Sequence, residues 1–181
     1  YGLLALSLET GQVQWEQAVA VPTGRTELDR LTDIDASMLP GDRSIYAVSF
    51  GGELVSLDAD SGEVQWRRSI KSYNNLAQVG SLIVVTDDAG TVWAMDAATG
   101  AAVWKQEGLA YRKLSPAGSL DGYVVVGDYE GYLHWLDPKD GKIVARSRAG
   151  GDPIRSSPVA GDKLLYVMNI DGKISAVSIK Q

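Results

Sequence analysis

The sequence predicts an all-β protein, and three observations support this prediction. Short runs of β-branched and aromatic residues, for example residues 82–85, 123–126 and 164–167, are bounded by Gly, Asp, Asn or Pro, which is typical of strands. One strand–turn–strand unit recurs along the whole chain. No stretch carries the apolar spacing of three and four residues that marks an amphipathic helix.

The recurring unit is clearest at residues 90–104. Alternating side chains at residues 91–94 predict a half-buried β-strand. Asp96 then opens a turn that ends at Gly100, because an aspartate carboxylate can accept bonds from nearby backbone N–H groups and glycine adopts positive φ easily. A second strand closes the unit at Trp104, which offers one large apolar surface.

Copies of this unit keep their spacing along the chain. Residues 52–66 repeat it with a terminal Trp66, whereas residues 131–145 end in Ala145 instead of tryptophan. The first glycines of the copies stand at positions 52, 90, 131 and 172, so the period is 38 to 41 residues. Four strand-like runs within such a period predict the four-stranded antiparallel blades of a β-propeller. A solenoid is the structural alternative, but its repeats are usually shorter or carry one strand each.

The repeat pattern predicts that residues 1–181 form one partial β-propeller domain made of several blades. We expect a partial blade at 1–20, an inserted loop at 21–35, complete blades at 33–70, 71–108 and 109–149, and an incomplete blade at 150–181. Propellers close with about four to eight blades. We therefore expect the chain to be part of a larger ring, in which Tyr1 is not the natural start.

Composition narrows the class of protein. The chain is 45% hydrophobic and 22% charged, which indicates a folded rather than a disordered protein. No run of about 18 apolar residues predicts a membrane span, and no signal peptide is recognisable. The chain has no cysteine, which excludes disulfides and thiolate metal sites. Its net charge of −6 and the lack of a basic patch argue against nucleic acid as a partner.

The inserted loop breaks the regular spacing. Trp15 and Trp66 lie 51 residues apart, against 38 for the next pair of tryptophans, so about a dozen extra residues fall in 21–35. Insertions between repeats map to loops on one face, often the binding face. Two interpretations stay open: a solvated loop whose leucines pack beneath the ring, or a protein-docking edge with charges for register and apolar residues as anchors.

The sequence predicts no catalytic residue, no cofactor site and no metal site. His134 is the single histidine, and its place in the apolar run 132–135 favours a structural role. Three aspartates occupy one repeated position four residues before a glycine, which turn chemistry explains better than catalysis. The carboxylates of two further turns are assigned to hairpins rather than to calcium. These residues are Asp58, Asp96 and Asp137, and then Asp87, Asp88, Asp128 and Glu130.

The connections between blades carry residues that are common in protein contacts. Tyr73, Tyr111, Arg112 and Arg155 all fall in such connections, which a propeller brings to one end of its ring. Tyrosine and arginine are enriched at interfaces, although solvation and blade packing are the commoner roles of any one of them.

Residues 94–104 resemble the tryptophan-docking repeat of the quinoprotein (PQQ-type) eight-bladed propellers, in which the tryptophan packs against the neighbouring blade. This resemblance implies that the chain is about half of an eight-bladed ring. It also implies one alternative function, a fragment of a PQQ-dependent oxidoreductase with PQQ and calcium. Many such enzymes carry a vicinal disulfide, and this chain has no cysteine. A ligand-sensing propeller domain of a larger receptor or kinase is a third interpretation.

Residues 26–35 and 126–135 carry a closer resemblance, to the propeller lipoproteins of the bacterial outer-membrane β-barrel assembly (BAM) complex, and it runs from Tyr1 to Gln181. It implies the carboxyl-terminal half of a non-enzymatic scaffold at the periplasmic face of the outer membrane of a Gram-negative bacterium. The scaffold would bind the POTRA domains of BamA and assist the folding and insertion of β-barrel proteins, with unfolded outer-membrane proteins as further partners. Its only link to the membrane would be an N-terminal lipid anchor absent from this chain.

The same resemblance implies a binding site in the inserted loop. The Asp-x-Asp of the family's BamA-binding surface falls on Asp33 and Asp35. Arg30, Asp29 and Leu31 are its expected neighbours in that surface.

Overall fold

The computed structural model describes residues 2–19, 38–49, 52–72 and 74–178, and these form two compact units, Tyr1–Tyr73 and Asn74–Gln181. Every regular element in the described ranges is a β-strand, and the strands build antiparallel sheets. The predicted all-β class with four-stranded antiparallel blades is thereby confirmed. In the same ranges no helix is long and apolar enough to cross a membrane.

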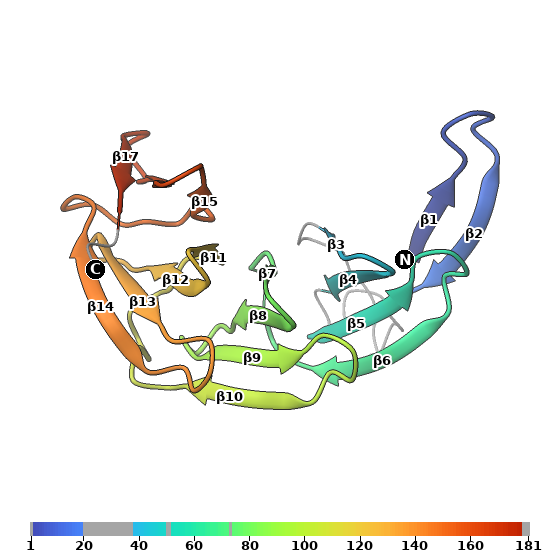
Figure 1. Ribbon diagram of the computed structural model, residues 1–181, viewed down its shortest axis with the longest axis horizontal. Helices are drawn as coiled ribbons and strands as arrows, with labels where there is room; N and C mark the ends of the chain where they lie inside the picture. The colour runs from blue at the N-terminus through green and yellow to red at the C-terminus, as the bar shows by residue number, and fades with distance from the viewer. Residues whose placement is uncertain (1, 20–37, 50–51, 73, 179–181) are drawn as a thin grey trace, which may run out of the picture. The chain divides into compact units, whose positions relative to one another are not determined.

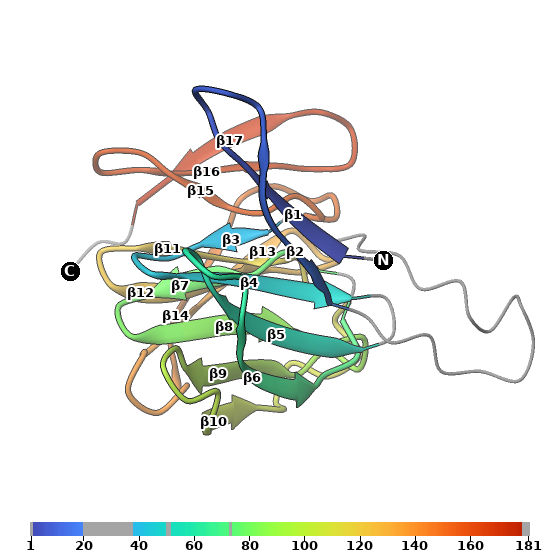
Figure 2. The same ribbon diagram turned by 90° about the vertical axis from the view of Figure 1, so that its right-hand side faces the viewer.

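The first unit contains a hairpin and a four-stranded sheet. The hairpin pairs β1 (Gly2–Leu6) with β2 (Val13–Ala18). The sheet has its strands in chain order, as Figure 2 shows for β3 to β6. These strands are β3 (Leu39–Pro40), β4 (Ser44–Ser49), β5 (Glu53–Asp58) and β6 (Val64–Ser69).

The second unit contains three sheets, again with strands in chain order (Figure 1). The first has four strands, β7 (Ala77–Val79), β8 (Leu82–Thr86), β9 (Val92–Asp96) and β10 (Ala102–Gln106). The second also has four, β11 (Ala117–Leu120), β12 (Tyr123–Gly127), β13 (Tyr132–Leu136) and β14 (Ile143–Arg148). The third has three described strands, β15 (Val159–Ala160), β16 (Leu165–Met168) and β17 (Ile174–Val177). The first strands of the sheets adjoin, since β11 contacts both β7 and β15.

The core of the second unit lies between its sheets. Val124 and Val126 of β12 pack into a cluster with residues of β8 and β9, whereas Val125 packs on the opposite face against residues of β16. A sheet covered on both faces needs apolar side chains at successive positions, which explains the continuous valine run. The strand predicted at residues 91–94 is found as β9, but it is more buried than expected: Val92 and Ala94 are buried, Trp93 is partly exposed, and Thr91, just before the strand, is also buried.

The turn between the third and fourth strands has one design in every described copy. The glycine N–H donates to the carbonyl four residues earlier: Gly62 to Asp58, Gly100 to Asp96 and Gly141 to Asp137. The aspartate carboxylates accept bonds from backbone N–H groups within the turn, at Ser61, Thr99 and Lys139 respectively. The turn role predicted for these aspartates is therefore confirmed.

Two tryptophans join neighbouring sheets through this turn. In the first unit, Trp15 Nε1 donates to the Ala59 carbonyl at 3.1 Å, and in the second unit Trp104 Nε1 donates to the Pro138 carbonyl at 2.7 Å. Each indole ring lies on the glycine of the same turn, Gly62 or Gly141, where a Cβ would lie well inside van der Waals contact of the ring. The glycine therefore serves two purposes, a positive φ and a flat seat for the indole.

The sheet β11–β14 holds its bulky side chain on a different strand. Ala145 of β14 takes the place of the tryptophan, and Trp135 of β13 stands directly opposite it in the ladder. Trp135 is buried in the cluster that joins this sheet to β16, but its Nε1 donates to Ser147 Oγ of its own sheet at 3.0 Å. The indole here supplies apolar volume without a hydrogen bond to the next sheet.

Comparing alanine substitutions at two glycines should separate the two purposes of the docking glycine. Gly141→Ala adds both backbone strain and a clash with Trp104, so the free energy of unfolding should fall by about 2–4 kcal/mol. Gly122→Ala is the matched control, because Gly122 also has a positive φ but has open space around its Cβ position, and it should cost about 1 kcal/mol. Urea unfolding of the intact protein measures both, and equal losses would contradict the docking role.

Candidate functional site

Hairpins and connections meet at one end of the second unit, which we call the loop end (residues 87–91, 107–115, 128–132 and 150–155). Backbone hydrogen bonds join these segments: Tyr129 N–H donates to the Arg112 carbonyl, and Ile154 N–H donates to the Asp128 carbonyl, both at 3.0 Å. Each connection thus rests on a hairpin of an adjoining sheet. This arrangement fixes the side chains that the connections display.

The hairpins of the loop end share one local cause. Asp87 Oδ1 accepts the Thr91 N–H at 2.8 Å, and Asp128 Oδ1 accepts the Tyr132 N–H at 3.0 Å, so each carboxylate closes its own turn. Gly90 and Gly131 follow with φ of 85° and 78°. The hairpin role predicted for Asp87 and Asp128 agrees with this geometry.

The second oxygen of Asp128 holds a buried polar network. Asp128 Oδ2 lies 2.7 Å from His134 Nε2 and accepts a bond from Arg112 Nε at 2.6 Å. The outer guanidinium nitrogen of Arg112 pairs with Glu130 at 2.5 Å. Asp128 is fully buried and His134 is 2% exposed. The network therefore ties the connection at Arg112 to strand β13, and it agrees with the structural role predicted for His134.

Charges in this network stabilise one another. Burial opposes ionisation of Asp128, but hydrogen bonds from His134, the Tyr132 amide and Arg112 hold its pKa below the ordinary value. The bond to Asp128 raises the pKa of the Arg112 guanidinium. Burial lowers the pKa of His134, so this ring is neutral and donates through Nε2. Its Nδ1 is enclosed and has no hydrogen-bond partner among the described residues.

The connection held by Arg112 displays two side chains on an unusual backbone. Tyr111 and Lys113 have φ of 65° and 49°, a region that residues other than glycine rarely adopt. Tyr111 is 96% exposed. Lys113 extends its ammonium group over the ring of Tyr129, 5.5 Å from the ring centroid. Such conformations persist only where surrounding contacts determine them, and here the bonds of Arg112 on the residue between provide these contacts.

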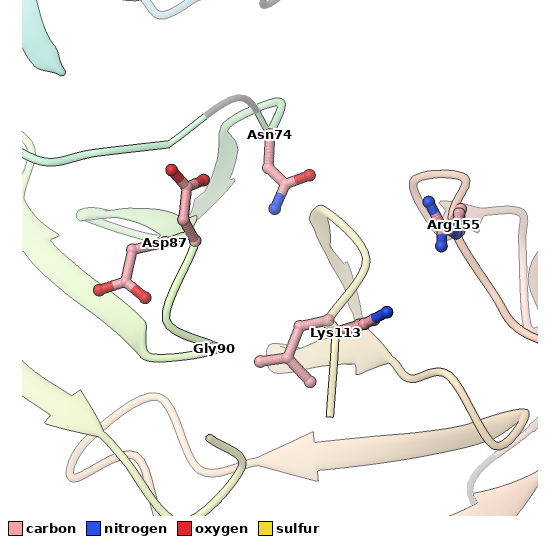
Figure 3. A pocket seen from close by; sticks show the side chains of 7 residues that line it. Asn74, Asp87, Gly90, Lys113 and Arg155 are labelled. Carbon is pink, nitrogen blue, oxygen red and sulfur yellow. The ribbon is translucent and has the colours of Figure 1, made fainter. Parts of the chain in front are cut away.

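Two hollows adjoin at Lys113. One, of about 440 Å³, is lined by charged and polar side chains from three connections and one hairpin, as Figure 3 shows. The other, of about 460 Å³, is more apolar. The first is lined by Asn74, Asp87, Asp88, Gly90, Lys113, Leu114 and Arg155, and the second by Asp88, Ala89, Gly90, Thr91, Glu107, Ala110, Tyr111 and Lys113.

Over the described ranges, no group of three or more His, Cys, Asp or Glu side chains is placed to hold a metal ion. The ring of His134 is committed to Asp128 and closed off from the surface. What the loop end offers is exposed aromatic area, cations and concave surface, which are features of binding sites.

The residues predicted from the sequence are placed as follows. Tyr111, Arg112 and Arg155 come together at the loop end. Tyr73 and the five residues of the inserted loop, Asp29, Arg30, Leu31, Asp33 and Asp35, lie outside the described residues. Lys113 and the Arg112–Asp128–His134 network were not predicted from the sequence. One signal was present: a ring with an N–H follows the hairpin aspartate by six residues in both copies, and Trp93 Nε1 donates to Asp87 Oδ2 as His134 does to Asp128.

Acidification should weaken the second unit through His134. The folded pKa of His134 lies below its ordinary value of 6.5, so the unfolded chain takes up the proton first. The free energy of unfolding should then fall as the pH drops from about 6.5 toward the folded pKa, by up to about 1.4 kcal/mol per pH unit. The lowered pKa of Asp128 adds a further loss only at lower pH, below the ordinary aspartate value of 3.8.

His134→Gln tests this assignment, because the amide can still donate to Asp128 but does not titrate. Urea unfolding at about pH 7.5, 6.5 and 5.5 should show a decline for the natural sequence and a flatter profile for the variant. Equal slopes for both proteins would mean that another group causes the decline.

Comparison with known proteins identifies the family. The sequence model of the family described as outer membrane protein assembly factor BamB matches residues 1–106 and 112–181. Outer membrane protein assembly factor BamB of Xanthomonas campestris is 43% identical over 179 residues, and that of Escherichia coli (strain K12) is 34% identical over 174 residues. These alignments cover 99% and 96% of this chain but 44% of each relative, so the chain spans less than half the length of these relatives.

Solved structures agree with this result. The crystal structure of BamB from Moraxella catarrhalis superimposes with a TM-score of 0.86 at 27% identity, over 97% of this chain and 52% of that chain. The computationally designed Ika4 protein, at 16% identity and a TM-score of 0.70, shares the fold alone. The partial β-propeller predicted from the sequence is thereby confirmed. The chain belongs to the family of outer membrane protein assembly factor BamB.

Proposed function

We propose that the intact protein is a non-enzymatic scaffold of the outer-membrane β-barrel assembly (BAM) complex. It binds the POTRA domains of BamA and assists the folding and insertion of β-barrel proteins. The observation that carries this proposal is the family match over nearly the whole chain, because the matched relatives are named outer membrane protein assembly factors and not oxidoreductases. Family membership therefore favours the scaffold over a PQQ-dependent enzyme.

The proposed location follows from the same relatives. Their names connect them with outer-membrane assembly in Gram-negative bacteria such as Xanthomonas campestris and Pseudomonas aeruginosa. We place the protein at the periplasmic face of that membrane, attached through a lipid anchor upstream of this chain. Unfolded outer-membrane proteins are its further proposed partners.

The described residues support a binding role rather than a chemical one. His134, the single histidine of the sequence, has one ring nitrogen bonded to Asp128 and the other enclosed, so it offers no proton to a bound substrate. The loop end instead presents an exposed tyrosine and two cations on a fixed backbone. A rigid body that presents fixed contact residues loses little conformational entropy when it binds a partner.

The proposed BamA contact is the inserted loop predicted from the sequence at residues 21–35. Asp33 and Asp35 are its central residues, with Arg30, Asp29 and Leu31 beside them in the sequence. Carboxylates at the rim of an interface set register and association rate, and an apolar residue such as Leu31 supplies an anchor. Arg30 contributes the opposite charge within the same short segment.

Charge reversal in the inserted loop tests this proposal. In the intact protein, Asp33→Arg together with Asp35→Arg should reduce the capture of BamA at least about tenfold, because two attractive contacts become repulsive. Circular dichroism, measured in parallel, should stay unchanged.

The matched control reverses two exposed carboxylates in another turn, Asp60→Arg with Glu63→Arg, and should leave capture as it is. Undiminished capture by the Asp33/Asp35 variant would reject the site. Equal loss in both variants would point to net charge rather than to a specific contact.

A further inference from the structure

The two hollows at the loop end form one composite surface with a charged half and an apolar half. They share Lys113, Gly90 and Asp88. We propose that this surface binds an extended polypeptide segment in which an acidic side chain adjoins a bulky apolar one. The acidic group lies between Lys113 and Arg155, and the apolar side chain lies on Tyr111.

The charged half carries two cations that form no ion pair with a carboxylate among the described residues. Arg155 is exposed and forms no ion pair with the rest of the described chain. Lys113 contacts the ring of Tyr129 and likewise has no carboxylate within the described residues. Figure 3 shows the ammonium end of Lys113 directed toward the side of Arg155 and away from Asp87. Two cations on one side of a concave site attract an anionic group to that side.

The carboxylates on the opposite side of the same hollow determine how an acidic ligand can be oriented there. Asp87 is already engaged, since its oxygens accept the Thr91 N–H and the Trp93 indole N–H. Asp88 lies beside it in the hairpin. An acidic ligand group is repelled from this wall and attracted by the opposite one, so a bound segment has one preferred orientation.

The apolar half is built around Tyr111. This side chain is 96% exposed, and Ala89, Ala110 and Thr91 line the groove beside it. An aromatic ring offers a large contact area at a small cost in conformational entropy, which is why tyrosine dominates many binding hot spots. Free inorganic anions would use the charged half alone, whereas a polypeptide segment uses both.

The backbone holds this surface ready for binding. Ala110 N–H donates to the Glu107 carbonyl at 3.0 Å, and Arg112 N–H donates to the Leu109 carbonyl at 3.2 Å. Arg112 is in turn paired with Asp128 and Glu130. Because these bonds hold Tyr111 and Lys113 at positive φ before any partner arrives, binding has little ordering entropy to overcome.

A third hollow at the loop end is a weaker candidate, and it shows why the first two are preferred. It has about 430 Å³ and is lined by Tyr129, Glu130, Tyr132 and Arg148, among others. Its cation is engaged, because the guanidinium of Arg148 lies over the Tyr132 ring at 5.3 Å and donates to the Gly150 carbonyl. Glu130 adds a negative charge that repels an acidic ligand.

The test measures binding of a short fluorescein-labelled peptide, in which aspartate alternates with phenylalanine, to the intact protein by fluorescence anisotropy. We expect saturable binding. A matched peptide with asparagine in place of aspartate should bind at least about tenfold more weakly, because the contact with Lys113 and Arg155 is lost. Lys113→Glu with Arg155→Glu should weaken binding of the aspartate peptide by a similar factor, and Tyr111→Ser should weaken both peptides.

The matched control is Lys163→Glu with Lys173→Glu, which makes the same charge change at exposed positions of the third sheet and should leave binding unchanged. Equal affinity for the two peptides, or no saturable binding of either, would overturn the proposal without any variant. Displacement of the peptide by millimolar inorganic phosphate alone would indicate a simple anion site and would also overturn it.

The proposed peptide-binding surface uses other residues than the proposed BamA contact at Asp33 and Asp35. BamA capture by the Lys113/Arg155 variant is therefore measured in parallel. Lost peptide binding with retained capture supports the separate site. Retained capture with no peptide binding by the natural sequence rejects this inference alone.

Discussion

The seat of an indole ring on a glycine is the contact on which the rest of the structure depends. Trp104 reaches from β10 to the turn at Pro138 and Gly141, and Trp15 makes the same contact in the first unit. A single sheet of short strands buries too little apolar surface to be stable by itself. The indole joins each such sheet to its neighbour by both apolar area and one directed hydrogen bond.

That contact requires an ordered turn, and the turn chemistry recurs at the opposite end of the sheets. Asp137 arranges the turn that receives Trp104, and Asp128 arranges the hairpin that receives Arg112. In both places a carboxylate binds its own backbone and leaves a neighbouring group positioned for a partner. The display of Tyr111 and Lys113 is thus a consequence of the same local rule that stacks the sheets.

Much of the fold could be predicted from the sequence, because strands and turns have local causes. The aspartate-to-glycine turns and the valine runs each depend on a few consecutive residues. The repeat period predicts the number of strands in each sheet. The loop end could not be predicted in this way. Its key contacts join Arg112 to Asp128 and Lys113 to Tyr129 across separate segments, and the left-handed backbone at Tyr111 and Lys113 has no sequence signature. The burial of the strand at residues 91–94 was underestimated, because alternation alone does not reveal how deeply each side chain is buried.

The second and third sheets of the second unit are joined without a tryptophan hydrogen bond between them, because Trp135 replaces the docking tryptophan there. Its indole supplies the apolar volume that Ala145 lacks, but its N–H donates to Ser147 within its own sheet. The contact between these two sheets combines the apolar side chains of Ile154, Leu165 and Val167 with a hydrogen bond from the Ile154 N–H to the Asp128 carbonyl at 3.0 Å. A directed bond of this joint therefore lies at the loop end and not at a tryptophan-receiving turn, so a change that loosens residues 150–155 affects the cohesion of the two sheets and the position of Arg155 together.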